Sequence, residues 1–250
     1  MSIGLGLGVS SGGYKAFSPT QINGLLAWFD YQKNVSVEPA PSRDVTKWGA
    51  RFGNFQLVPQ ESNARPQFND TTGINFSSTA PADSLKLQTK SSVDTSITLD
   101  TSDGGFCIAL MIGGSTEDVD GVYFGDLESS DTSLVTGGSD DPVSFILQSG
   151  GIAKTYEVTD YLGGTTIDSG DVFSLVFNSS NQGVTRAILA NVVQSGHTNT
   201  ADITISVFGG SDSTTNFNGT IKEIIIYDKQ LTNVELTRLY NYMKRGEIQN

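Results

Sequence analysis

Short runs of alternating hydrophobic and polar residues recur along this chain, and turn-forming residues separate them. Alternation with a period of two predicts β-strands that bury one face. Strands are predicted at residues 24–30, 73–76, 84–87, 171–178, 185–193 and 202–208. The run from Phe106 to Ile112 is apolar at nearly every position, which predicts a central strand covered on both faces. A hairpin is predicted over residues 142–158, with its turn at Ser149, Gly150 and Gly151.

The C-terminal part of the chain carries the single predicted helix. An Asn-Gly turn at residues 218–219 leads into a β-prone run from Ile221 to Tyr227. Thr232 is followed three residues later by Glu235, which is the spacing of a capping box at a helix N-terminus. Gly246 is suited to end this helix in a left-handed conformation.

The regular spacing of short strands and turns predicts an all-β fold. We expect a two-sheet antiparallel β-sandwich of the jelly-roll type with one short C-terminal helix. A chain of 250 residues can form one large β domain, and no composition shift or internal repeat marks a second. The predicted organisation is an N-terminal arm over residues 1–17, a jelly roll over 18–246 and a tail over 247–250.

The N-terminal segment has a strand pattern of its own. Four aliphatic residues alternate with glycines there: Ile3, Leu5, Leu7 and Val9. Glycine on one face weakens an isolated strand but lets another backbone come close. A disordered leader is one interpretation. An assembly arm that lies against a neighbouring subunit is the preferred one, because a disordered leader has no need of four aliphatics in register. Without a basic start, the segment is not expected to be a signal peptide.

Composition excludes several classes of partner and chemistry. The net charge is −12, with 15 basic and 27 acidic residues, which argues against nucleic acid because phosphate binding needs clustered Lys and Arg. No apolar run approaches the ~20 residues of a transmembrane helix, so no membrane partner is expected. The single cysteine, Cys107, is predicted to be a small buried hydrophobe. The single histidine, His197, is predicted to lie in a surface loop, away from Cys107.

Several short motifs occur in the order found in a known superfamily. They are the strand at 24–30 with Trp28 and Asp30, the pair Val45 and Trp48, the turn at Asn54, Gln60, Arg65-Pro66, the strand at 73–76, the run 188–191, and the closing strand and helix from Phe217. In this order, over about residues 22–246, the chain resembles the concanavalin A-like lectin/glucanase superfamily, in particular the laminin-G-like jelly rolls of bacterial and phage proteins. Glu223 and Tyr227, within the closing strand, are interpreted as structural residues.

The resemblance carries expectations about chemistry. Glucanases of the superfamily bear a Glu-x-Asp-x-Glu strand, whose alternate carboxylates supply a nucleophile and an acid. This chain lacks the motif, so it is not expected to be an enzyme. Calcium is the one cofactor considered, because hard cations bind oxygen ligands; its candidate ligands are Asp118, Asp120, Asp140 and Asp141.

Lectin-like members of the superfamily bind glycans through aromatic rings and polar side chains on loops or a concave face. The candidate glycan-binding residues here are Tyr123, Phe124, Tyr156 and Tyr161. The alternative for each is that its ring fills the core or stiffens a sheet face, since aromatic residues are favoured on packed strands.

The resemblance leaves three hypotheses for function. The first is a non-enzymatic structural protein of a tailed-phage virion, such as a capsid decoration or cement protein, a head fibre or a tail component. Its N-terminal arm would bind the major capsid or tail protein, further copies would form a homo-oligomer, and the exposed domain at the virion surface would meet host or environmental glycans. The alternative is a carbohydrate-binding or host-receptor-binding lectin module without a capsid role. The third, a glycan hydrolase, is disfavoured by the missing carboxylate motif.

Overall fold

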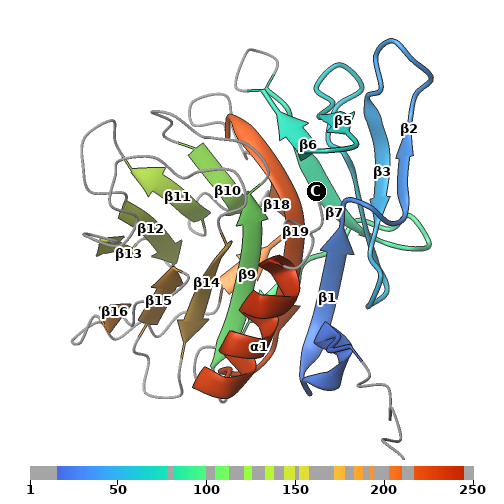
Figure 1. The fold of residues 1–250 in the computed structure, drawn as a ribbon. Coiled ribbons are helices and arrows are strands. Elements are labelled where there is room, and N and C mark those ends of the chain that lie inside the picture. The colour runs from blue at the N-terminus through green and yellow to red at the C-terminus, as the bar shows by residue number, and fades with distance from the viewer. Residues whose placement is uncertain are drawn as a thin grey trace, which may run out of the picture.

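Two large antiparallel sheets face each other in the computed structural model of the chain (Figure 1). The structure describes residues 16–77, 82–99, 105–112, 121–125, 133–137, 144–149, 152–157, 172–177, 183–187, 192–193, 203–209 and 217–244. Within them, one sheet runs in the order β16-β15-β14-β9-β19-β6-β5, with β1 also paired to β19. The other runs in the order β13-β12-β11-β10-β18-β7-β4-β3-β2. We name them sheet A and sheet B.

The bounds of the elements are as follows. Sheet A contains β1 (Leu25–Asp30), β5 (Gln67–Asn69), β6 (Gly73–Phe76), β9 (Phe106–Ile112), β14 (Val172–Phe177), β15 (Gly183–Ala187), β16 (Val192–Val193) and β19 (Gly219–Tyr227). Sheet B contains β2 (Val35–Val37), β3 (Val45–Gly49), β4 (Phe55–Pro59), β7 (Leu85–Thr89), β10 (Gly121–Gly125), β11 (Ser133–Gly137), β12 (Ser144–Ser149), β13 (Ile152–Glu157) and β18 (Val207–Phe208). A small third sheet pairs β8 (Ile97–Leu99) with β17 (Ile203–Ile205), and the helices are η1 (Pro19–Gln21) and α1 (Asn233–Lys244).

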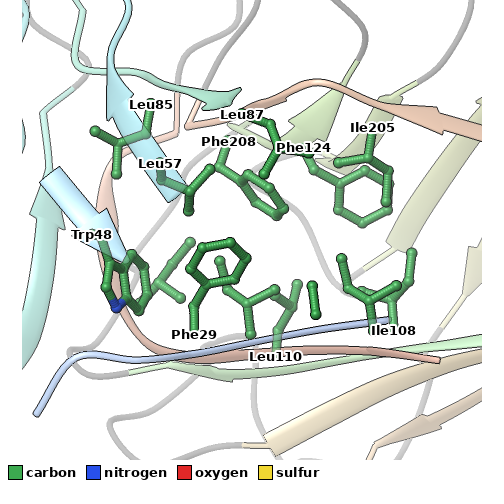
Figure 2. Close-up of a cluster of buried hydrophobic side chains, with 14 of the residues drawn as sticks. Phe29, Trp48, Leu57, Leu85, Leu87, Ile108, Leu110, Phe124, Ile205 and Phe208 are labelled. Carbon is green, nitrogen blue, oxygen red and sulfur yellow. The ribbon is translucent and has the colours of Figure 1, made fainter. Parts of the chain in front are cut away.

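Strand alternation divides the hydrophobic side chains of sheet A into two layers. On β9, Phe106, Ile108 and Leu110 belong to one buried cluster, whereas Cys107, Ala109 and Met111 belong to another. The first cluster, the inner layer, lies between the two sheets; Figure 2 shows Ile108 and Leu110 facing Phe124 and Phe208 of sheet B. Because successive residues point to opposite faces, a strand that is apolar at every position serves both layers.

The outer layer lies between sheet A and α1. The helix crosses in front of β9 and β19 (Figure 1), and its residues Leu236, Leu239 and Met243 are buried against Ile225 and Tyr227. Strand β19 contributes residues to both the inner and the outer layer, and all nine of its residues are buried. Burying a large aliphatic side chain contributes about 1.5–3 kcal/mol, so covering the second face of sheet A adds substantially to stability.

The start of α1 has the predicted capping box. The amide of Glu235 donates to the Thr232 hydroxyl oxygen at 3.3 Å, and the amide of Thr232 donates to a Glu235 carboxylate oxygen at 2.8 Å. Lys229 adds an ion pair to the same carboxylate at 2.7 Å. Gly246 lies outside the described residues. Neither helix in the described part of the chain has the length and apolar character that spanning a bilayer requires.

The predicted fold class is confirmed: the described chain is mostly β, with antiparallel sheets forming a sandwich and one short C-terminal helix. The central strand prediction is also confirmed, because β9 pairs with β14 on one side and β19 on the other. The hairpin prediction holds as β12 paired with β13. Cys107 is buried, as expected.

Two predicted strands are each divided in the structure. The segment 185–193 is not one strand, because Val184 and Thr185 of β15 pair antiparallel with Val193 and Val192 of β16, so the chain reverses between them. The segment 202–208 divides at Ser206. Its first half, β17, pairs with β8, whereas its second half, β18, joins sheet B between β7 and β10. The Ser206 backbone makes the change of sheet, donating to Gly125 and accepting from Leu87.

Candidate functional site

The structure places one predicted glycan-binding residue in the core. Phe124 of β10 is 0% exposed and belongs to the inner layer, where its ring centroid lies 6.3 Å from that of Phe208. A ring in this position cannot contact a ligand in solution. The expectation that Phe124 binds glycan is therefore corrected: it is a packing residue, as the alternative interpretation held.

The other predicted site residues are placed only in part. Tyr123 lies on β10, where the register against β11 shifts between Val122 and Phe124, and Tyr156 lies on β13 opposite Phe145. Several residues lie outside the described part of the chain, and their roles stay predictions: Tyr161, Asp118, Asp120, Asp140, Asp141, Ile3, Leu5, Leu7 and Val9. Among the described residues, no group of three or more His, Cys, Asp or Glu side chains is placed to hold a metal ion.

The chemically most distinctive part of the described structure is a buried polar group on the outer face of sheet A. Strands β1 and β19 pair there, with Trp28 opposite Ile225 and Asp30 opposite Glu223. The indole N–H of Trp28 donates to Glu223 Oε1 at 2.6 Å. Both side chains are almost fully covered, since Trp28 is 4% exposed and Glu223 is 7% exposed. We call this group, together with Asp30, Arg51 and Tyr242, the Glu223 cluster.

The segment after β3 brings Arg51 into the cluster. Its amide donates to the Trp28 carbonyl at 2.7 Å, and the Trp28 amide donates to the Phe52 carbonyl at 3.2 Å. Gly53 permits this close approach: its φ is +91°, and a Cβ there would lie 2.4 Å from the Leu26 carbonyl oxygen. The Arg51 guanidinium then stacks 3.9 Å above the Trp28 ring and forms an ion pair with Asp30 at 2.7 Å.

Helix α1 contributes Tyr242 to the cluster. The Tyr242 ring meets the Trp28 ring edge-on, with centroids 5.7 Å apart and an interplanar angle of 80°. Phe17 in turn packs edge-on against Tyr242, with centroids 6.1 Å apart. The Trp28 indole thus contacts a cation from one segment, a carboxyl group from β19 and an aromatic ring from α1. These contacts join four separate pieces of chain.

Burial dominates the electrostatics of the cluster. Desolvation, and after it the negative charge of Asp30, raise the pKa of Glu223 to about 8, against the opposing effects of the Trp28 hydrogen bond and the Arg51 charge. Burial likewise raises the pKa of the Tyr242 phenol, with a smaller contribution from Glu223. Burial also raises the pKa of Tyr227, whose hydroxyl donates to the Pro19 carbonyl at 3.1 Å. Glu223 is therefore largely protonated near neutral pH.

A protonated carboxyl group beside an ionised one is the combination that acid–base hydrolysis requires. In this structure, however, α1 and Trp28 cover Glu223, so the pair does not meet a substrate as it stands. The interpretation of Glu223 and Tyr227 as structural residues agrees with this burial. The sequence did not indicate that Arg51 and Asp30 lie beside Glu223. The available signal was Glu223 itself, an acid directly before three consecutive isoleucines in a strand-forming run.

No protein-family model and no curated protein matches the chain. Solved structures do resemble it. One comes from a study in which cell entry of botulinum neurotoxin type C depends on interaction with two ganglioside molecules; the match has a TM-score of 0.54 at 15% identity, over 90% of this chain and 53% of that one. The binding domain of botulinum neurotoxin DC in complex with SialylT matches with a TM-score of 0.55 at 13% identity, over 88% and 51%. The same domain in complex with rat synaptotagmin II matches with a TM-score of 0.53 at 14% identity, over 88% and 52%.

The likeness concerns the fold, since all three identities are 15% or lower. The chain spans about half the length of each of these structures. The agreement extends over most of this chain. The chain thus has the antiparallel β-sandwich that its sequence predicted, with a fold similar to part of the botulinum neurotoxin binding domains. The resemblance of its motifs to the concanavalin A-like superfamily stays a prediction.

Proposed function

We propose that this protein is a non-enzymatic binding module that recognises glycans carried by a receptor. The observation that supports this function best is the match over about 90% of the chain to domains that bind gangliosides or SialylT. A fold does not determine a function, so the proposal needs a site as well as a scaffold. The aromatic residues Tyr123, Tyr156 and Tyr161 are the proposed ring contacts.

The proposal is consistent with the chemistry of the described residues. Glu223 is 7% exposed beside Trp28, which packs against Tyr242 of α1, and this burial suits a structural role better than a catalytic one. Net charge of −12 disfavours a polyanionic ligand and leaves neutral or weakly charged glycans as the favoured class. Asp118, Asp120, Asp140 and Asp141 are proposed as ligands of a calcium ion that assists such binding.

A glycan array probed with the full chain tests the proposal, with and without calcium. We expect binding to a small set of related glycans, and we expect Tyr123→Ala, Tyr156→Ala or Tyr161→Ala to weaken it at least about tenfold. Val234→Ala is the control, because Val234 is 61% exposed on α1, which packs on sheet A, whereas β10 and β13 belong to sheet B. Absence of binding to glycans and to ganglioside-containing vesicles, by protein with an intact far-ultraviolet circular dichroism spectrum, would contradict the proposal.

Attachment to a larger assembly, such as a phage virion, is compatible with the same module. The alternating segment Ile3–Val9 supports it, because an added strand can bind through main-chain hydrogen bonds. Deletion of residues 1–14 should then abolish assembly and leave glycan binding unchanged. A truncated protein that still assembles normally would remove the assembly role without affecting the binding proposal.

A further inference from the structure

A buried carboxyl group stands where four parts of the fold meet. Glu223 of β19 accepts the Trp28 indole hydrogen bond from β1, and the same indole is stacked under Arg51 and against Tyr242 of α1. Asp30 lies opposite Glu223 in the β1–β19 register and holds Arg51. A change in the charge of Glu223 therefore acts on the contacts that hold α1 and the Arg51 segment to sheet A.

The groups around Glu223 come from every element that packs on it. Strand β1 contributes Asp30, and the segment after β3 contributes the cation Arg51. Helix α1 contributes the Tyr242 phenol, and β19 contributes Tyr227. Strand β9 contributes Met111, the register partner of Glu223, and Cys107, the register partner of Tyr227. Lys222 precedes it on β19, and its carbonyl accepts from the Tyr31 amide. Of the groups that act on Glu223 most strongly, Arg51 is the one cation, and Asp30 already neutralises it.

The neutral and ionised forms of Glu223 make different demands on this environment. A neutral carboxyl group fits, because its carbonyl oxygen accepts the Trp28 N–H and no net charge is buried. An ionised Glu223 places a second carboxylate beside Asp30, and both then compete for Arg51. The charge is relieved if Arg51 shifts from its place over the indole or if α1 separates enough to admit water. Either movement weakens the packing of Trp28 against Tyr242.

We propose that Glu223 is a proton-dependent latch, which holds α1 and the Arg51 segment against sheet A while it carries a proton and loosens them when it ionises. This role is independent of glycan binding. It assigns a regulatory device to a residue that the binding proposal does not use. The loosened state belongs to mildly alkaline conditions, since burial and Asp30 raise the pKa of Glu223 to about 8.

The test follows the two tryptophan indole N–H signals of the full chain by ¹⁵N–¹H nuclear magnetic resonance from about pH 5 to about pH 10. Trp28→Phe assigns the Trp28 signal by its loss. We expect this signal to titrate with a midpoint near pH 8. The titration should be absent in Glu223→Gln, which keeps the acceptor oxygen and cannot ionise. Asp30→Asn should move the midpoint down, because the neighbouring negative charge is removed and Arg51 is released toward Glu223.

Amide hydrogen exchange of α1 supplies the second measurement. Base accelerates amide exchange in the wild type and in Glu223→Gln alike, so the ratio of their exchange rates removes this intrinsic effect. The latch predicts that the ratio of wild-type to variant rates rises by about tenfold above about pH 8. A Trp28 signal that does not titrate overturns the proposal. A constant exchange ratio overturns it as well, even if the signal titrates, since Glu223 would then ionise without loosening α1.

Discussion

The Trp28 indole nitrogen lies 2.6 Å from a carboxyl oxygen of Glu223, although 195 residues separate them in the sequence. The hydrogen bond joins the first strand of the fold to the last one, on the face of sheet A that α1 covers. Because an unpaired N–H or carboxyl group in such a place costs about 1–3 kcal/mol, each of the two residues explains the presence of the other.

The stability of the protein should depend on pH through Glu223. The carboxyl pKa is about 8 in the folded protein and about 4.5 as its ordinary value, so the folded state holds a proton that the unfolded state gives up. The free energy of unfolding should therefore fall as the pH rises from about 4.5 to about 8, and then level off. Glu223→Gln should remove this slope and stabilise the protein at about pH 9 by on the order of 1–3 kcal/mol. Urea unfolding at several pH values measures both effects, and an unchanged slope would contradict the assignment.

Arg51 should contribute more to stability than an arginine with a similar partner at the surface. Arg51→Ala removes the stacking on Trp28 and leaves Asp30 unpaired, at an expected cost of about 1–2 kcal/mol. Arg51→Lys should restore part of this, because lysine keeps the charge but not the planar contact. Arg43→Ala is the control. Arg43 forms a bidentate pair with Asp70, which is 70% exposed, and its guanidinium lies 5.1 Å from the Phe68 ring centroid, so its loss should cost less than the loss of Arg51.

The capping box should account for measurable stability of α1. Thr232→Ala removes the acceptor for the Glu235 amide and should lower the free energy of unfolding by about 1 kcal/mol, whereas Thr232→Ser should be close to neutral. Thr237→Ala serves as the matched control. The Thr237 hydroxyl bonds the Asn233 carbonyl within the helix, and this bond contributes little. Thermal unfolding followed by circular dichroism compares the three variants; equal effects of Thr232→Ala and Thr237→Ala would rule out a specific capping role.

Gly209, at the end of β18, should tolerate alanine poorly. Its φ is +93°, and an added Cβ would lie 2.4 Å from a ring carbon of Phe76 and 3.0 Å from the Asp83 carbonyl oxygen. Gly209→Ala is expected to destabilise the protein by at least about 2 kcal/mol. Gly49→Ala is the comparison, since a Cβ added at Gly49 would come no closer than 3.3 Å to its nearest neighbour, Asn34 Cβ. Chemical unfolding of both variants compares their losses of stability. A larger loss for Gly49→Ala than for Gly209→Ala would contradict the prediction.

The features that the sequence predicted correctly are those with a local physical cause. Continuous apolar character indicated that β9 is covered on both faces, and the spacing of Thr232 and Glu235 indicated where α1 begins. The division of residues 202–208 had no local signal. Alternation is the same whether a strand stays in one sheet or changes sheets at Ser206, and only pairing with β8 on one side and β7 on the other decides it.

The same limit applies to the candidate sites. A phenylalanine is suited both to a ligand-binding site and to a hydrophobic core, so the sequence does not decide between them for Phe124. Its burial against Phe208 follows from the assembled sandwich. The Glu223 cluster draws residues from β1, β19, α1 and the segment after β3, so no spacing in the sequence reveals it. An acid directly before three isoleucines in a strand-forming run was a sign that some partner had to exist, but it did not identify Arg51.

The position of β19 has a consequence for synthesis of the chain. This strand lies between β9 on one side and both β1 and β6 on the other, yet it follows all three in the sequence. A nascent chain that has emerged from the ribosome as far as β18 therefore holds the two sides of sheet A without the strand that joins them. The hydrophobic side chains that β19 covers in the folded protein are exposed at that stage. Productive folding must wait for one late segment, and chaperones that bind exposed apolar strands have their longest opportunity on this protein during that interval.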